Sequence, residues 1–452
     1  MESHLESAAF SCKLASDHEL RCHNPESQEQ LSIAVDNIVC IRALSGTSQQ
    51  EYSVLFLDKH GEQSGDSGHI TKIRTSGLPS TLLSTHLHET VPVHLDSSAF
   101  RIHVIISTGS GTGGAKSIYQ HILQPFLSFL AVTAYEVHET QSTETIKELA
   151  QSTFLPCAQA GIRQTVIVLS GDGGLIDIVD TFYNSTDSVR ARPHIALIAA
   201  GTGNAMAHSV GLRHPAVALI ALLRGTPRHV PVFVANFSPG ARHVTDEGRG
   251  RESIGPGNKV YGTVVASWGF HAALVADSDT AEYRKFGADR FKLAAKELLS
   301  PPDGSPTHSY RGTISLSKPS GANDDNEQMK PMPHEEHMYA LVTLVARLEK
   351  EFLISPDSSP LDGRLRLIHF RPIPPDDAMQ LMMKAYQGGL HVHEEPVTYL
   401  EVNGFRVDFC EKEERWRRVC IDGKIVAVEQ DGWVEIRREP RNLVDLISVP
   451  GV

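Results

Sequence analysis

The order of hydrophobic and polar positions divides the chain into three blocks. Residues 1–97 hold short β-type runs between polar, Ser/Gly-rich stretches, which predicts a small β-rich unit. Residues 98–226 alternate apolar strands with helical patterns, which is typical of a parallel sheet with crossover helices. Residues 227–452 are mostly strand-like, with helical segments at about 280–299 and 376–387, and this favours a sandwich or barrel.

The middle block carries the clearest periodicity. The run RIHVIIST (101–108) is a short apolar strand that enters a glycine cluster, and apolar residues then recur at helical spacing over 118–130. Three further strands are expected at AVTAYEVHE, TVIVLSG and HIALIAAG, and glycine-rich turns follow the last two. In the third block, the aperiodic stretches 238–258 and 317–337 are expected to be surface insertions.

Composition narrows the class of protein. The chain has 452 residues, of which 40% are apolar and 21% charged, as in an ordinary globular protein. No apolar run reaches the roughly 18 residues of a transmembrane helix, and the acidic N-terminus is unlike a signal peptide. The net charge of −12 argues against a nucleic-acid binder.

The cysteine and histidine patterns give no sign of a metal or disulfide framework. The six cysteines are scattered without a C-x-x-C pair, so we expect neither a zinc site nor disulfides, and a reducing, cytosolic compartment. The 23 histidines are dispersed, and single ones such as His103 and His271 are expected to be structural or on the surface. The segment EKEERWRR (411–418) is expected to be a solvated strand edge, with contact to anionic lipid headgroups as the alternative.

Three glycine-rich turns, each after a strand of the middle block, are the main functional signal. They are STGSGTGGAK (107–116), LSGDGGLIDI (169–178) and AAGTGNAMA (199–207). In an open parallel sheet such turns gather at the carboxyl edge, where ligands bind. Glycines let backbone N–H groups approach a phosphate, and the following helix N-terminus adds positive partial charge. A nucleotide site is therefore predicted.

Two common nucleotide motifs fit the first turn poorly. Ala115 separates Gly114 from Lys116, so the turn is not a Walker A loop. Gly109, Gly111 and Gly114 match the dinucleotide fingerprint loosely, with Glu136 or Glu139 as the acid it requires, so a dinucleotide site stays open as an alternative.

Asp172 is the candidate for chemistry. It lies between Gly171 and Gly173, without bulky neighbours, beside an expected helix N-terminus. Such a carboxylate suits a general base for a substrate hydroxyl, or an anchor for magnesium beside a triphosphate. The alternative is an ordinary helix N-cap.

Taken together in this order, the turns resemble the lipid kinase family that includes sphingosine, ceramide and diacylglycerol kinases. SGDGG (170–174), GTGNAMAHSVGL, SWGFHAALVADSDTAEYRKFGADRF and the late Asp422-Gly423 carry the resemblance, which covers about 100 to 437. It implies a Rossmann-like α/β nucleotide-binding domain at 98–226 and a β-sandwich lipid domain at 227–452, with the active site in the cleft between them.

The resemblance also implies individual roles. Asp172 would be catalytic, Ser170 and Asp279 would contact the substrate with Asp277 as second choice, and Arg284 and Arg290, on one predicted helix, would bind phosphate. The nucleotide-binding set is Ser110, Gly111, Gly113, Thr140, Gly171, Gly173, Asp177, Gly201, Thr202, Gly203, Asn204, Arg284, Arg290, Asp422 and Gly423.

The chain departs from the family pattern at four places. Ser107-Thr108 replaces Asn-Pro, Gly174 replaces the usual Thr or Leu, and Lys424 replaces the Glu of the late motif. The segment HETQSTETIKEL keeps Thr140 but lacks the usual basic and His residues.

The sequence thus predicts an ATP- and Mg²⁺-dependent kinase for the primary hydroxyl of a sphingoid base. Diacylglycerol or ceramide are alternative substrates, and a soluble NAD kinase or a lipid-binding pseudokinase are alternative functions. We expect a cytoplasmic location, reversible membrane contact and no nucleic-acid partner. The metal ligands, the oligomeric state and the role of residues 1–97 are left open.

Overall fold

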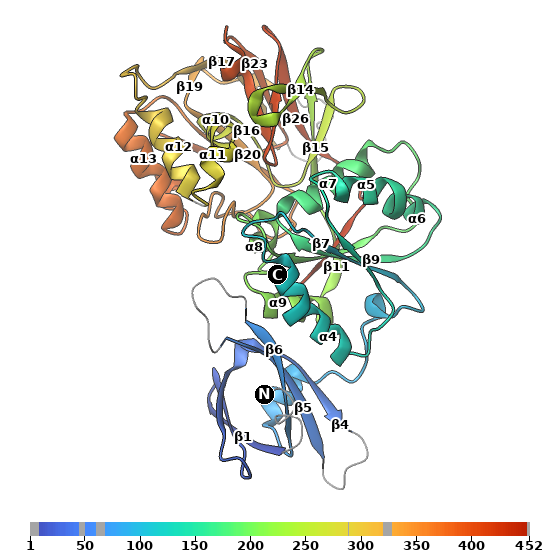
Figure 1. Ribbon diagram of the computed structural model, residues 1–452. Helices are drawn as coiled ribbons and strands as arrows, with labels where there is room; N and C mark the ends of the chain where they lie inside the picture. Colours follow the sequence, from blue (N-terminus) through green and yellow to red (C-terminus); the bar gives the residue numbers. More distant parts are fainter. Residues whose placement is uncertain (1–8, 45–49, 60–67, 288, 320–327, 450–452) are drawn as a thin grey trace.

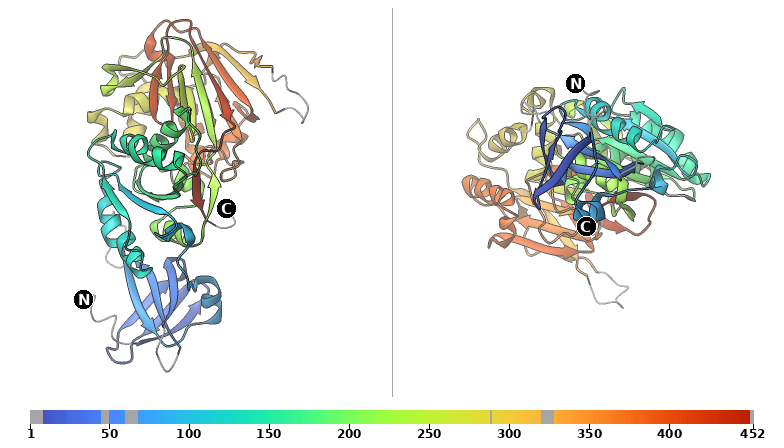
Figure 2. Two further views of the ribbon diagram at one scale, coloured as in Figure 1. Left: turned by 90° about the vertical axis from the view of Figure 1, so that its right-hand side faces the viewer. Right: turned by 90° about the horizontal axis from the view of Figure 1, so that it is seen from below.

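A computed structural model describes residues 9–44, 50–59, 68–287, 289–319 and 328–449. Three parts follow one another along the long axis of the molecule, from an N-terminal β unit through an α/β sheet to a C-terminal β lobe (Figure 1). The left view of Figure 2 shows the same order from the side, and the right view looks along this axis with the N-terminal sheet in front. In the described ranges, no helix has the length and apolarity needed to cross a bilayer.

The N-terminal unit is a six-stranded sheet with the order β3-β2-β1-β6-β5-β4. Its elements are β1 Ala9–Ser16, β2 Glu19–His23, β3 Gln30–Ala34, β4 Ile38–Leu44, β5 Glu51–Asp58, β6 His69–Thr75 and the helix α2 Ser80–His86. Alternate residues such as Phe10, Leu20 and Val54 fill a small core of their own. Other strand residues, Val39 and Leu57 among them, pack into the core of the next part.

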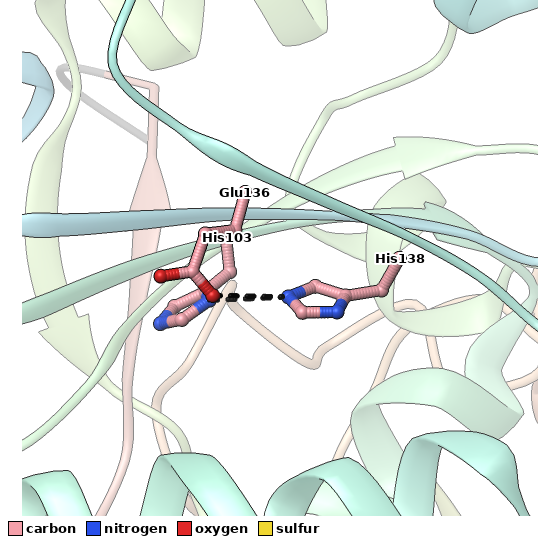
Figure 3. Close-up of side chains that lie close together, drawn as sticks. All are labelled: His103, Glu136 and His138. Atoms are coloured by element: carbon pink, nitrogen blue, oxygen red, sulfur yellow. Dashed lines mark hydrogen bonds and ion pairs between the residues drawn. The ribbon is translucent and has the colours of Figure 1, made fainter.

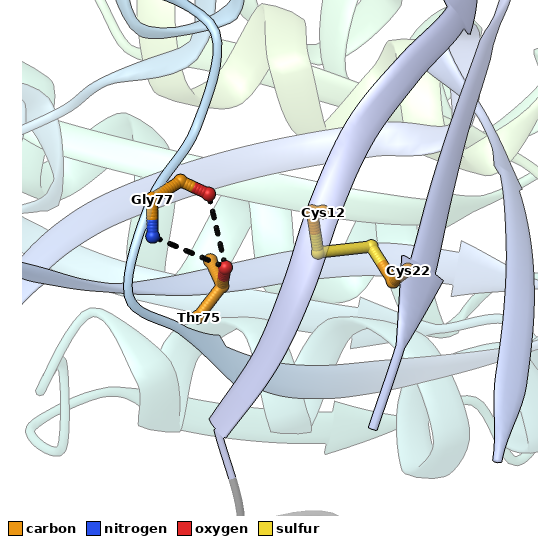
Figure 4. The surroundings of a disulfide bond; sticks show 4 residues. All are labelled: Cys12, Cys22, Thr75 and Gly77. Carbon is orange, nitrogen blue, oxygen red and sulfur yellow. Dashed lines mark hydrogen bonds between the residues drawn. A yellow bond between two sulfur atoms is a disulfide. The ribbon is translucent and has the colours of Figure 1, made fainter. Parts of the chain in front are cut away.

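A disulfide joins Cys12 of β1 to Cys22 of β2 (Figure 4). The two residues are direct partners in the antiparallel register, with Cα atoms 4.1 Å apart. The expectation that no disulfide forms was therefore wrong. Spacing alone does not reveal a hairpin register, and the register is what brings these two sulfurs together.

The α/β part is a six-stranded sheet with the order β11-β27-β10-β9-β7-β8. Its strands are β7 Arg101–Ile106, β8 Glu136–Glu139, β9 Gln164–Ser170, β10 His194–Ala199, β11 Thr226–His229 and β27 Asp445–Ser448. All pairs are parallel except the one between β11 and β27. Strand β9 is buried along its whole length and β7 is buried apart from Arg101, as expected where helices cover both faces.

Helices pack on both faces of this sheet. They are α3 Ala115–Ile118, η3 Tyr119–Leu123, α4 Gln124–Phe129, α5 Thr145–Leu149, η4 Ala150–Phe154, α6 Leu155–Gln159, α7 Asp172–Asn184, α8 Ala205–Ser209 and α9 Pro215–Arg224. The turns η3 and η4 are π-helical, and each precedes a proline, Pro125 or Pro156. Proline has no N–H to donate, which explains the interrupted α-helical ladder.

The C-terminal lobe packs a seven-stranded sheet beside an eight-stranded one, both built of antiparallel pairs. Its strands are β12 Val232–Phe237, β13 Arg242–Thr245, β14 Gly250–Ser253, β15 Lys259–Gly262, β16 Val265–Gly269, β17 Tyr310–Ser317, β18 Lys330–Pro331, β19 Glu336–His337, β20 Tyr339–Thr343, β21 Leu365–Phe370, β22 Val397–Val402, β23 Gly404–Phe409, β24 Arg418–Ile421, β25 Lys424–Ala427 and β26 Trp433–Glu439. Its helices are α10 Phe270–Ser278, α11 Ala281–Arg284, α12 Asp289–Leu299 and α13 Pro375–Met383.

The architecture is the predicted one, a parallel-sheet α/β region joined to an antiparallel β region, but several details differ. Strand β27 leaves the C-terminal block and pairs with β10 in the α/β sheet. The supposed insertion at 238–258 contains the hairpin β13–β14 of the eight-stranded sheet. The second supposed insertion, 317–337, contributes β18 and β19, and its residues 320–327 lie outside the described part.

Candidate active site

The three glycine turns meet at the carboxyl edge of the parallel sheet, and they touch backbone to backbone. A Cβ atom on Gly201 would lie 2.4 Å from the Cα of Gly171, and one on Gly111 would lie 2.7 Å from the carbonyl oxygen of Ala200. Gly111 also has φ of 56°, a left-handed conformation that favours glycine. The hydroxyl of Ser110 accepts a 3.2 Å hydrogen bond from the Gly171 N–H, linking the first two turns.

Polar side chains fix the shape of the first and third turns. The Thr140 hydroxyl, at the end of β8, accepts the Thr108 N–H at 3.0 Å, and the Thr108 hydroxyl donates to the Thr140 carbonyl at 2.8 Å. Asn204 has φ of 54°, and its amide bonds both the N–H and the carbonyl of Gly201. Gly113 and Thr202 are exposed on these turns, so their backbones are accessible to a ligand.

Asp172 joins the second turn to the third. It is the first residue of α7, but it does not cap that helix. Its two carboxylate oxygens instead accept the N–H groups of Ala205 and Met206, at 2.7 and 2.9 Å, at the start of α8. Burial raises the pKa of Asp172, while these two N–H donors act in the opposite direction. The carboxylate is thus less exposed than its glycine neighbours suggested.

A cavity of about 350 Å³ extends from Asp172 into the C-terminal lobe. It begins at Asp172, Thr202 and Gly203 and continues between α10, α12 and α13. Most of its lining is apolar, and the apolar residues include Ile176, Val265, Phe270, Leu274, Phe291, Leu348, Phe352, Met379, Met382 and Met383. Such a space accepts a hydrocarbon chain with one end beside the carboxylate of Asp172.

A few polar groups interrupt this apolar lining. Asp279 and Arg290 face the cavity, with Arg290 Nη1 3.4 Å from Asp279 Oδ1. His271 bonds the Ser267 hydroxyl at 2.7 Å, and burial lowers the pKa of His271 to about 4. Burial raises the pKa of Glu349, which accepts a hydrogen bond from Tyr386.

Asp422 and Gly423 also line this cavity, although they lie far from the glycine turns in the sequence. The Asp422 carboxylate accepts three backbone N–H groups, from Thr263, Val264 and Val265, at 2.6 to 3.0 Å. Burial raises the pKa of Asp422 to about 7 despite these donors, and the charge of Asp172 adds to the shift. The Asp422 turn is therefore anchored to the segment that leads into β16.

Asp177, one turn and a half further along α7 than Asp172, does not face this cavity. Its Oδ1 lies 2.8 Å from Nζ of Lys424, the residue that replaces the glutamate of the late motif. Asp177 is mostly buried and Lys424 is half-buried, so each neutralises the other across the contact of the two lobes.

Several predicted site residues do not line the cavity. The Ser170 side chain is buried, and its hydroxyl donates to the Gly171 carbonyl rather than facing the cavity. A Cβ on Gly174 would lie 2.3 Å from that same hydroxyl, which explains glycine there. Asp277 pairs with Arg415 at 2.8 Å, outside the cavity, so Asp279 is the better-placed acid. Gly173 is exposed at the start of α7.

The prediction that Arg284 and Arg290 share one helix was wrong. Arg284 ends α11, whereas Arg290 belongs to α12, and Gly287 between them has φ of 56°. The role expected of the Arg284 side chain lies outside what the structure describes.

The prediction of a solvated strand edge at 411–418 holds only in part, because residues 412–415 are exposed whereas Glu411 and Arg417 are buried. Arg417 is buried and donates to three backbone carbonyls, and Trp416 stacks on His308 with ring centroids 4.0 Å apart. Residues Glu414–Arg417 form the short helix η8, which lines a second pocket together with residues of α10 and α12.

Sequence reasoning missed His271, Glu349 and the methionines of α13, all of which line the cavity. Met379, Met382 and Met383 follow helical spacing, and this pattern does not distinguish a cavity wall from a protein core. Nothing in the local sequence of His271 or Glu349 marks them as cavity residues.

Comparison with known proteins agrees with the resemblance to lipid kinases that the sequence motifs carry. The model of the diacylglycerol kinase catalytic domain matches residues 101–235. Sphingosine kinase 1 of Mus musculus is 23% identical over 364 residues, which cover 73% of this chain and 87% of that protein. Sphingosine kinase B of Dictyostelium discoideum is 39% identical over 71 residues, which are 16% of this chain and 9% of that relative.

The fold matches a solved structure. A crystal structure of a diacylglycerol kinase from Bacillus anthracis str. Sterne superimposes with a TM-score of 0.50 at 15% identity, covering 77% of this chain and 97% of that one. With the glycine turns, the carboxylate of Asp172 and the matched domain in agreement, residues 101–235 form a diacylglycerol kinase catalytic domain, and the chain is an ATP-dependent lipid kinase similar to sphingosine kinases.

Proposed function

We propose that the chain transfers the γ-phosphoryl group of ATP to the primary hydroxyl of a sphingoid base. The observation that carries the proposal is the position of Asp172, which lies between the clustered glycine turns and the inner end of an apolar cavity. A phosphoryl donor on the turns and a lipid hydroxyl in the cavity would both reach this carboxylate. The similarity to two sphingosine kinases supports the choice of substrate class.

In this mechanism residues 98–226 bind ATP and residues 227–452 bind the lipid. The exposed backbones of Gly111, Gly113 and Thr202 would hold the phosphates. Asp172 would accept the proton of the attacking hydroxyl, because its raised pKa gives it more basic character than an ordinary aspartate. Arg290 would steady charge on the transferred group.

Mg²⁺ is proposed as the ion of the ATP complex, where it would neutralise phosphate charge. The carboxylates near the turns do not form a dedicated site for it. Asp177 is paired with Lys424, and Asp172 and Asp422 already accept two and three backbone N–H groups. Mg²⁺ would therefore arrive with the nucleotide.

Asp279 is the proposed contact for the substrate headgroup. A sphingoid base carries an ammonium beside its hydroxyls, whereas diacylglycerol and ceramide carry no cation. A carboxylate that faces the cavity suits the former. The predominance of apolar side chains in the cavity argues against NAD, whose ribose and phosphate groups need polar partners.

Reversible membrane contact is part of the proposal, because the lipid must leave a bilayer to enter the cavity. Met383, which lines the cavity, is an exposed large apolar side chain, and so is Leu293 on the cavity-lining helix α12. The cytoplasmic location predicted from the sequence stays a prediction.

A parallel assay tests the substrate. Purified chain, labelled ATP and Mg²⁺ would be offered sphinganine, ceramide, diacylglycerol or NAD, with wild type and Asp279→Asn side by side. We expect label on sphinganine, and a raised KM for sphinganine in Asp279→Asn. Label confined to diacylglycerol or ceramide would reject the sphingoid base, and label on NAD alone would reject a lipid substrate.

A further inference from the structure

A cluster of two histidines and one glutamate lies on one face of the parallel sheet, where β7 and β8 pair (Figure 3). His103 belongs to β7, and Glu136 and His138 belong to the neighbouring edge strand β8. In the parallel register His103 is the direct partner of Glu136. Residues two apart on a strand share a face, so Glu136 and His138 both project beside the His103 ring.

The three potential ligand atoms form a compact triangle. His103 Nδ1 lies 3.3 Å from His138 Nε2 and 3.6 Å from Glu136 Oε2, and His138 Nε2 lies 3.8 Å from the same Glu136 oxygen. A point equidistant from the three atoms would be about 2.1 Å from each, close to the bond lengths of zinc to imidazole nitrogen and carboxylate oxygen. An ion at that point would lie in the plane of the three atoms, so a tetrahedral site requires the Glu136 oxygen to move a few tenths of an ångström closer, which its exposed side chain can do.

The surroundings suit a metal ion that enters from solvent. The His103 side chain is fully buried against Phe154, whereas 20% of His138 and 56% of Glu136 are exposed. The ion would lie between a rigid inner ligand and two outer ligands that water reaches. Two imidazoles and one carboxylate select a borderline divalent transition metal over Mg²⁺ or Ca²⁺, which prefer oxygen ligands only.

We propose that His103, Glu136 and His138 bind one divalent transition-metal ion of the zinc class, which fastens the edge strand β8 to β7. The role of the ion is structural rather than catalytic, because it lies far from the reacting groups. Along the extended chain, His103 is roughly 16 Å from Thr108 on the first glycine turn. Strand β8 continues into Thr140, which holds Thr108 by two hydrogen bonds. Fixing β8 thus also fixes the base of that turn.

The bound ion is exchangeable rather than permanent. Three protein ligands leave the fourth position of a zinc site to water. Within the part of the chain that the structure describes, Nε2 of His103 has no hydrogen-bond partner, so the supporting contact that usually strengthens a histidine ligand is absent.

Cobalt, a spectroscopic substitute for zinc, tests the site in the full-length chain. The protein would carry no polyhistidine tag, be stripped with EDTA, and be titrated with Co²⁺ while visible absorption is recorded. We expect one cobalt ion per chain with d–d absorption, displaced by Zn²⁺, and a higher melting temperature with either ion. Glu136→Gln and His138→Asn should bind at least tenfold more weakly and lose the shift in melting temperature.

The matched control is His121→Asn, which removes an exposed histidine from another segment of the same domain. It should bind cobalt like the wild type. Absence of cobalt binding by the folded wild type overturns the proposal, as does cobalt binding that His138→Asn leaves unchanged. Both readouts are independent of kinase activity, so a failed substrate assay has no bearing on them.

Discussion

The ammonium nitrogen of Lys424 lies 2.8 Å from a carboxylate oxygen of Asp177, in an ion pair that joins the C-terminal lobe to helix α7. The two positions are 247 residues apart in sequence. Lys424 replaces the glutamate of the late D-G-E motif, and the structure shows that this lysine pairs with Asp177. The departure from the family pattern therefore has a structural role.

Loss of this pair should destabilise the chain. Lys424→Met leaves the mostly buried Asp177 carboxylate without its cation, and we expect a loss of about 1–2 kcal/mol in the free energy of unfolding, reduced by the partial exposure of Lys424. Urea titration measures it, with Lys147→Met on α5 as control, because Lys147 is half-buried like Lys424 but its ion-pair partner Glu144 is exposed.

A double-mutant cycle isolates the pair itself. Asp177→Asn combined with Lys424→Met should be less destabilised than the sum of the single variants, by about 0.5–1 kcal/mol. Strict additivity would mean that the two side chains do not interact in solution.

Activity should fall as the solution becomes acidic. Burial raises the pKa of Asp172 and raises that of Asp422 to about 7, and the two carboxylates repel each other. A general base works only when it is deprotonated, and a raised pKa moves protonation to higher pH. We therefore expect kcat/KM to decline toward acidic pH, and to do so at a higher pH than an ordinary aspartate would give, in a profile measured between pH 4 and 9. A profile that stays flat over this whole range would show that no such carboxyl group controls the reaction.

The contact of the second and third turns should not tolerate a methyl group. In Gly201→Ala the new Cβ would meet the backbone of Gly171 at 2.4 Å, so one turn must move. We expect a stability loss of about 1–3 kcal/mol together with a higher KM for ATP.

Gly77→Ala is the matched control for this change, because nothing lies within 4 Å of its Cβ position. Thermal melting and ATP titration would compare the two variants. Wild-type KM for ATP in Gly201→Ala would contradict a nucleotide site at these turns.

Local pattern was enough to predict the architecture and the gathering of the glycine turns. Strand periodicity and glycine content are local properties, and parallel strands end at a common edge. The partners of Asp172 were not predictable in this way, since Ala205 and Met206 belong to a turn more than thirty residues later.

Contacts that depend on register or on distant segments escaped prediction for the same reason. The Cys12–Cys22 bond follows from a hairpin register, and the cluster of His103, Glu136 and His138 follows from the register of two parallel strands. Isolated histidines in a sequence carry no mark of such a neighbour.

The most direct test of the central claim is turnover by Asp172→Asn, with Asp180→Asn on the same helix as control. Asparagine keeps the shape but removes the base, and its amide cannot accept both N–H groups of α8, so a stability loss of about 1–3 kcal/mol is expected as well. We predict a fall in kcat of at least about 100-fold in protein that is still folded, with Asp180→Asn near wild type. A folded Asp172→Asn that retains wild-type kcat would contradict the account.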